Sequence, residues 1–395
     1  MPIFFSQSQL ERVTEYPAGT TNDRSLLYKY WVSPMCAKLV SLLPTWVAPN
    51  LLTLIGWICT MTTFGLSAFF MSDMSNDAPR WVYFVMGFLI FAYMTLDNMD
   101  GKQAFRTGSS TPLGEALDHG VDSFSVGIII AGSAAVTQTG VWWPIIALGP
   151  AMIAFYLAHW QEYFNHYLEL GLLGPTEAEV IAALGYIVTG IFGTSMWTSV
   201  HSIFGWHFKF SMFVMLATIG AAIWTTLYGL YDGITRAKAK GVPLPRAISQ
   251  LFPFSLSMVA GALFVWKTYR TYDAGYSFAY IATFNLLFSY LTILCIVQRI
   301  CQLSFSYFYL PMLPLLVACF HSLIGSPLVT DESTIIVLLV FYIFNTSFFC
   351  FEIIYGFCKA LNIKFLKIQY PNKATRQAEA DMSRTINEES EVLLP

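Results

Sequence analysis

Four aspartates stand at fixed spacings in one short stretch of the chain. Asp97 and Asp100 are three residues apart, and Asp118 and Asp122 are four residues apart. On an α-helix these spacings place the members of each pair about 60° and about 40° apart around the axis, so each pair shares one face. Two such faces turned toward each other would form a cage of four carboxylates.

Such a cage would need a cation. Clustered carboxylates repel one another by several kcal/mol, and a divalent ion relieves that repulsion. Oxygen ligands favour Mg²⁺ or Mn²⁺, and Mg²⁺ usually keeps positions for water and substrate phosphate. Gly101 and Gly114 would let a ligand approach the backbone, and Lys102 and Arg106 could meet phosphate oxygens. These residues predict a site for a metal-bound diphosphate, whereas a single aspartate here would more often be a solvated loop residue.

The composition of the chain predicts that this site works at a membrane. Apolar residues make up 56% of the chain and charged residues 11%, against about 45–50% and about 25% in soluble proteins. A soluble domain this apolar could not cover its surface with polar groups. The net charge of −3 gives no sign of a nucleic-acid partner. The seven cysteines are scattered, so neither a zinc site nor a disulfide framework is expected.

Ten stretches are apolar and long enough to be candidate transmembrane helices, since a span needs about 20 residues. They cover residues 50–71, 81–97, 119–140, 142–160, 180–198, 210–231, 250–267, 277–295, 307–325 and 333–354. The predicted fold class is an all-α integral membrane protein with about ten transmembrane helices. Both termini then lie on one side, together with 17 of the 21 Lys and Arg residues. The positive-inside rule makes that side, and the carboxylates, cytoplasmic.

The spacing of the acidic stretch also carries a family resemblance. The pattern Asp-x2-Asp-Gly-x2-Ala-x9-Gly-x3-Asp-x3-Asp resembles the signature of the CDP-alcohol phosphatidyltransferase family. The matching positions are Asp97, Asp100, Gly101, Ala104, Gly114, Asp118 and Asp122. Four short motifs resemble the eukaryotic choline/ethanolamine phosphotransferase branch of that family: Asp-Gly-Lys-Gln-Ala, Asp-His-Gly, Ala48-Pro49-Asn50 and His159-Trp160-Gln161.

The resemblance implies an activity and a role for each position. The four aspartates would hold two Mg²⁺ or Mn²⁺ ions on the diphosphate of CDP-choline or CDP-ethanolamine. His119 would be the general base that takes the proton from the hydroxyl of diacylglycerol; Asp122 is a weaker candidate, because a metal ligand is a poor base. CMP would leave, and phosphatidylcholine or phosphatidylethanolamine would form. The implied substrate-binding positions are Asn50, Gly101, Lys102, Ala104, Arg106, Gly114 and Glu115.

The resemblance also organises the rest of the chain. It implies a homodimer in the membrane of the endoplasmic reticulum or Golgi, with the active site facing the cytoplasm. Residues 1–48 would form a cytoplasmic segment with an interfacial helix, or an apolar linker packed on the bundle. Residues 49–235 would form the phosphotransferase core, 236–362 a four-helix transmembrane part, and 363–395 a polar cytoplasmic tail.

Phe105 departs from the family pattern, which has an arginine at that position. Either Arg106 or Lys102 supplies the phosphate contact and Phe105 packs against a helix or the cytidine, or one contact is missing. A catalytically reduced relative is therefore one alternative. A second alternative is a phosphatidyltransferase that uses CDP-diacylglycerol. The motifs Asp-Gly-Lys-Gln-Ala and Asp-His-Gly count against it. A third is a cation transporter, which would carry its carboxylates nearer the middle of the membrane.

Four glutamates crowd the connection between the fourth and fifth predicted spans. They are Glu162, Glu169, Glu177 and Glu179. They could form a wall of the donor site that meets a choline or ethanolamine cation. The sequence alone favours the simpler interpretation, a solvated acidic loop.

Overall fold

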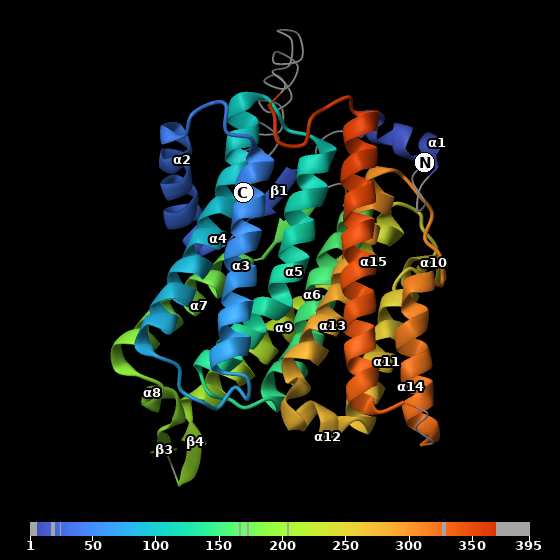
Figure 1. Ribbon diagram of the computed structural model, residues 1–395. Coiled ribbons are helices and arrows are strands. Elements are labelled where there is room, and N and C mark those ends of the chain that lie inside the picture. Colours follow the sequence, from blue (N-terminus) through green and yellow to red (C-terminus); the bar gives the residue numbers. More distant parts are fainter. Residues whose placement is uncertain are drawn as a thin grey trace.

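The fold is a bundle of long helices, seen in a computed structural model that describes residues 6–16, 20–23, 25–165, 167–171, 174–203, 205–325 and 329–368. Within these residues, eight helical segments are long and apolar enough to cross a membrane. They are α3 (Pro49–Phe70), α4 (Arg80–Thr107), α5 (Pro112–Val136), α6 (Trp142–Asn165), α7 (Pro175–Phe192), α9 (Phe210–Ala239), the run that ends in α13 (Ser277–Ile300), and α15 (Asp331–Ala360). Figure 1 shows most of them side by side.

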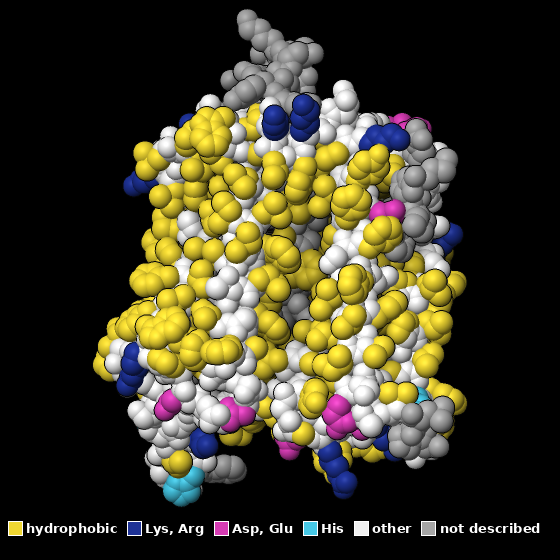
Figure 2. All heavy atoms as spheres, viewed as in Figure 1, with side chains coloured by type: hydrophobic (Ala, Val, Ile, Leu, Met, Phe, Trp, Pro, Cys, Tyr) yellow, Lys and Arg dark blue, Asp and Glu magenta, His cyan; other side chains and the backbone are white. Residues whose placement is uncertain are grey.

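Two shorter apolar helices, α11 (Phe252–Lys267) and α14 (Leu313–Ile324), pack against each other at the edge of the bundle. With them, each of the ten predicted apolar stretches contains a helix. Figure 2 shows apolar side chains over the middle of one face, with charged side chains gathered mainly toward its two ends. The predicted class, an all-α integral membrane protein, is confirmed.

The helices that carry the aspartates differ from their predicted limits. α4 continues to Thr107, well past the predicted end at 97, and Gly108 then ends it with a positive φ of 59°. α5 begins at Pro112 instead of 119, because the Thr111 hydroxyl accepts a hydrogen bond from the Gly114 amide and caps the helix. The apolar pattern stops at the first polar residues, but the helical backbone does not. All four aspartates therefore lie inside helices.

The N-terminal segment lies at the same end of the bundle as the C-terminal end of α15. Its elements are α1 (Gln7–Glu11), η1 (Arg12–Glu15), β1 (Thr20–Asp23), the π-helical turn η2 (Tyr28–Val32) and α2 (Ser33–Leu42). Leu10 packs against α15 at Gly356, where an added Cβ would lie 2.8 Å from a methyl carbon of Leu10. α2 packs on α4 through Cys36 and Val40. An even number of spans between the two ends agrees with this arrangement.

Short elements connect the long helices. β1 pairs in parallel with β2 (Tyr167–Leu170), and β3 (Val200–Ile203) forms a hairpin with β4 (Trp206–Lys209), seen at the lower left of Figure 1. The other short elements are α8 (Ser195–Thr198), α10 (Leu244–Ser249), α12 (Tyr269–Thr271), η3 (Tyr272–Tyr276) and η4 (Leu310–Met312). α13 is almost wholly buried, because α5, α6 and α15 all pack against it.

Candidate active site

The structure brings the predicted carboxylates together beside α3, which packs against both α4 and α5. One carboxylate oxygen from each of Asp97, Asp118 and Asp122 lies within 4.8 Å of the other two. Asp100 is buried at the same site and accepts a hydrogen bond from the Thr53 hydroxyl of α3. We refer to these four aspartates as the carboxylate cage.

The carboxylate cage lacks a cation of its own. Among the described residues, no Lys or Arg side chain forms an ion pair with it, and the nearest basic nitrogen is His119 Nε2, 4.0 Å from Asp118. Tyr93 donates a hydrogen bond of 2.7 Å to Asp122. One buried oxygen of Asp97 and one of Asp118 have no hydrogen-bond partner in the described part of the chain. Clustered oxygen ligands with unfilled positions fit a hard divalent cation.

The glycines predicted to admit a nucleotide line a cavity beside the cage, together with Ala104. A side chain at Gly101 would meet nothing within 4 Å, so the space next to this backbone is open. Gly114 faces Asn50, whose amide oxygen would lie 3.6 Å from a Cβ added there. The Asn50 amide nitrogen donates to the backbone carbonyl of Phe365 at 2.8 Å. Asn50 thus holds the segment that follows α15 beside the cage.

The two basic residues of the stretch have different surroundings. Lys102 Nζ lies 3.1 Å from the Tyr28 hydroxyl at the edge of the cavity. Arg106 turns to α2 and donates to the backbone carbonyls of Val40 and Leu43, the latter at 2.8 Å. It therefore holds the C-terminal end of α2. Phe105 is 67% exposed and lines the cavity, so it is not packed against a neighbouring helix; a contact between Phe105 and the cytidine stays a prediction.

His119 lies between the carboxylate cage and a second buried group of polar residues. Its ring centroid is 4.9 Å from that of His159, and its Nδ1 has no hydrogen-bond partner in the described structure. His159 Nδ1 lies 3.2 Å from a Glu162 oxygen. Glu162 in turn accepts from Arg299 of α13 at 2.8 Å. The sequence did not predict that His159 stands directly behind His119.

Arg299 is the centre of this second group, which we call the arginine network. Its guanidinium bonds to Glu115 and Glu162 and donates to the Tyr16 hydroxyl, which itself donates to Glu115. Burial, followed by the charge of Glu115, raises the pKa of the Tyr16 hydroxyl, so Tyr16 stays neutral. From the sequence, Arg299 was used only as one of the basic residues that predict which side of the membrane is cytoplasmic. An arginine at the end of a predicted transmembrane helix could have indicated a buried partner.

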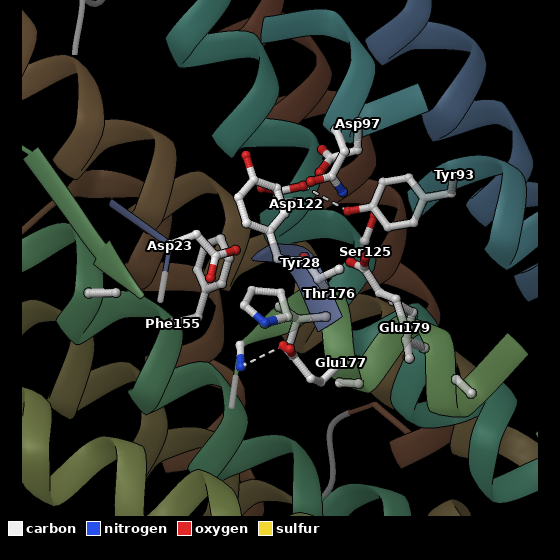
Figure 3. Close-up of a pocket in the computed structure, with 18 of the residues that line it drawn as sticks. Asp23, Tyr28, Tyr93, Asp97, Asp122, Ser125, Phe155, Thr176, Glu177 and Glu179 are labelled. Carbon is white, nitrogen blue, oxygen red and sulfur yellow. Dashed lines mark hydrogen bonds between the residues drawn. The ribbon is translucent and has the colours of Figure 1, made fainter. Parts of the chain in front are cut away.

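A large cavity runs from the carboxylate cage between α5, α6, α7 and α9. Its volume is about 2160 Å³. Figure 3 shows Asp97 and Asp122 at its polar end, with Tyr93, Ser125 and Phe155 nearby. Farther from the cage, most of its lining is apolar and includes Ile129, Ala151, Ala182, Phe213, Val214 and Trp224. A single cavity thus joins an acidic polar site to an apolar chamber.

Comparison with known proteins gives a consistent result. The model of the CDP-alcohol phosphatidyltransferase family matches residues 46–298, which include the whole carboxylate cage. An uncharacterized class-I member of that family from Dictyostelium discoideum is 33% identical, over 85% of this chain and 81% of its own length. Choline/ethanolaminephosphotransferase 1 of Arabidopsis thaliana is 29% identical, over 88% and 94%. The Saccharomyces cerevisiae protein of the same name is 34% identical, over 49% and 50%.

Proposed function

The chain belongs to the CDP-alcohol phosphatidyltransferase family and is a CDP-alcohol phosphotransferase, and from that premise we propose that it transfers phosphocholine or phosphoethanolamine from CDP-choline or CDP-ethanolamine to diacylglycerol. The products would be CMP and phosphatidylcholine or phosphatidylethanolamine. Relatives named choline/ethanolaminephosphotransferase align over nearly nine tenths of the chain and support this choice of substrates.

The observation that carries the proposal is the form of the cavity. Its carboxylate end suits a metal-bound diphosphate, and its apolar end suits the acyl chains of a neutral lipid. A CDP-alcohol is water-soluble, whereas diacylglycerol stays in the membrane. Because one cavity offers both environments, the two substrates can meet at the boundary where the carboxylates end.

The donor would be held by residues of α3, α4 and α5. Asp97, Asp100, Asp118 and Asp122 would hold two Mg²⁺ or Mn²⁺ ions, which when bound neutralise charge on the diphosphate and on the departing phosphate. Lys102 faces the same cavity and would contact a phosphate oxygen. Asn50, Gly101, Ala104 and Gly114 would also contact the donor. Arg106 and Glu115, for which the resemblance implies a part in substrate binding, would act indirectly, by holding α2 and Arg299.

His119 would remove the proton of the acceptor. The hydroxyl oxygen of diacylglycerol forms a bond to the β-phosphorus as the bond from that phosphorus to the bridging oxygen breaks. The hydroxyl proton passes to His119, and the electron pair of the broken bond leaves with CMP. An imidazole nitrogen without a partner, buried beside the carboxylate cage, is suited to accept that proton.

We place the carboxylate cage and both ends of the chain on the cytoplasmic side of the endoplasmic reticulum or Golgi membrane. The distribution of Lys and Arg supports this orientation. We also propose that the enzyme is a homodimer, as the family resemblance implies.

An assay with purified protein in lipid nanodiscs tests the reaction. Diacylglycerol would be supplied with labelled CDP-choline or CDP-ethanolamine, with and without Mg²⁺ or Mn²⁺. We expect label in phosphatidylcholine or phosphatidylethanolamine only when the metal is present. A parallel reaction with CDP-diacylglycerol and inositol should give no product. Product in that reaction alone would reject the proposed substrates.

A further inference from the structure

Glutamates from α6 and α7 surround the cavity next to the carboxylate cage, and two of them already have partners. Glu162 is bound by Arg299 and His159. Glu177 accepts the backbone amides of Leu27 and Gly174, both at 3.0 Å, and so joins the N-terminal segment to the start of α7. The side chain of Glu169 lies outside the described residues. These contacts account for Glu162 and Glu177 as structural groups.

Glu179 differs from both. It is only 6% exposed, yet within the described structure it has no hydrogen bond and no ion pair. It lines the cavity, and it lies within electrostatic range of Asp122, Asp97 and Tyr93. Figure 3 shows it on the α7 side of the cavity, near Ser125. A buried carboxylate without a partner is costly, and a cationic ligand would offset that cost.

The charge balance of the site indicates which cation this is. Two divalent ions would balance the four aspartates of the cage and leave Glu179 uncompensated. Lys102 would face the diphosphate, which also carries negative charge. Among the described residues, no Lys or Arg forms an ion pair with Glu179. The donor supplies a positive charge of its own, because choline and ethanolamine each carry one ammonium group, two carbons from the phosphate ester. Diacylglycerol brings no charge.

We propose that Glu179 binds the ammonium group of the donor alcohol and so makes the enzyme select cationic over neutral CDP-alcohols. This inference rests on the proposed function and deepens it. It assigns a role to one of the four glutamates and separates that glutamate from its neighbours. Because Glu179 lines the same cavity as Asp122 (Figure 3), it would hold the headgroup near the reacting phosphate.

Equilibrium binding tests this assignment without turnover. The full-length protein in nanodiscs with Mg²⁺ would be titrated with CDP-choline and with its neutral isostere, in which a tert-butyl group replaces trimethylammonium. Wild-type protein should bind CDP-choline at least about 10-fold more tightly, since a charge-assisted contact contributes about 10- to 150-fold. Glu179→Gln should remove most of that preference, because it should weaken the binding of CDP-choline and leave the affinity for the isostere nearly unchanged.

Glu177→Gln is the matched control, two residues away on the same helix. It should lower the thermal midpoint, because it weakens two backbone contacts, while the preference for CDP-choline persists. Equal binding of both ligands by wild-type protein would overturn the assignment, even if Glu179→Gln failed to fold. Equal weakening of both ligands in Glu179→Gln, with a raised Mg²⁺ requirement, would instead assign Glu179 to the metal site.

The outcome for the proposed reaction is separate. If the binding preference is present but no phospholipid forms, the proposed transfer fails and the role of Glu179 stands. If phospholipid forms but the preference is absent, the proposed transfer stands and the role of Glu179 fails.

Discussion

Two acidic groups lie side by side in this protein, and they differ in how their charges are compensated. In the arginine network, Arg299 forms ion pairs with both Glu115 and Glu162, and it donates a further hydrogen bond to the Tyr16 hydroxyl. In the carboxylate cage, no Lys or Arg of the described chain compensates the aspartates. α5 contributes to both groups, with Glu115 in the first and Asp118 one turn later in the second.

This difference separates two uses of a buried charge. A charge that the chain itself neutralises can hold helices in place, and its removal exposes the partner left behind. A charge that the chain leaves uncompensated raises the free energy of the protein alone and lowers it when a cation binds. The two groups also differ in burial: the side chains of Glu115 and Glu162 are 9% and 1% exposed, whereas that of Asp118 is 29% exposed. The group whose charges are left unpaired is therefore also the one that a ligand can reach from the cavity.

The largest expected effect is on the carboxylate cage. Removal of divalent ions with a chelator should abolish transfer, and alanine at Asp97, Asp100, Asp118 or Asp122 should lower the rate about 10²-fold or more. The thermal midpoint of these variants should stay level or rise in metal-free buffer, because like charges that repel have been removed. Activity assays and thermal unfolding on the same preparations measure both. Full activity of any two folded variants would mean that the cage does not hold the catalytic metals.

The next effect is on His119, which stands between the two groups. His119→Ala should lower turnover about 10²- to 10⁴-fold, as expected for loss of a general base. The donor KM should change much less, because His119 is proposed to act on the acceptor. Initial rates at varied CDP-choline separate the two constants. A collapse of donor affinity with turnover preserved at saturation would move the base elsewhere.

The arginine network should show the opposite pattern to the cage. Arg299→Leu leaves Glu115 and Glu162 buried without a cation, which should cost about 3–5 kcal/mol of stability. We expect a clearly lower thermal midpoint, with the Mg²⁺ dependence of the remaining activity unchanged. The triple variant Arg299→Leu, Glu115→Gln, Glu162→Gln should regain much of the lost stability. If Arg299→Leu unfolds at the wild-type temperature, the contrast between the two groups is wrong.

The smallest expected effect is at Phe105. The side chain is 67% exposed, so Phe105→Arg should leave the thermal midpoint unchanged. A new phosphate contact would then lower the donor KM by about 10-fold. An unchanged KM would mean that Lys102 already supplies the contact. Arg106→Ala provides the contrast, since loss of its bonds to Val40 and Leu43 should mainly loosen α2.

Local patterns in the sequence were enough to predict the membrane class, the approximate positions of the helices and the pairing of the aspartates on helix faces. Hydropathy and helical periodicity depend only on residues that are close in the sequence, so they can be assessed without knowing how the helices pack. The spacing of Asp97 with Asp100, and of Asp118 with Asp122, is of this kind. The predicted helix ends were less accurate. Gly108 ends α4 through its backbone conformation and Thr111 begins α5 as its cap, and hydropathy reports neither effect.

Tertiary structure alone decided which charges are paired. Arg299 and Glu115 are 184 residues apart in the chain, and Asn50 lies 315 residues from the Phe365 carbonyl that it binds. No local pattern relates such positions, because their contact depends on how several helices pack at once. The same packing gave Glu177 two backbone partners, whereas Glu179 has no hydrogen bond or ion pair with any residue that the structure describes. Two glutamates of one residue type, two positions apart, were therefore indistinguishable until the helices around them were in place.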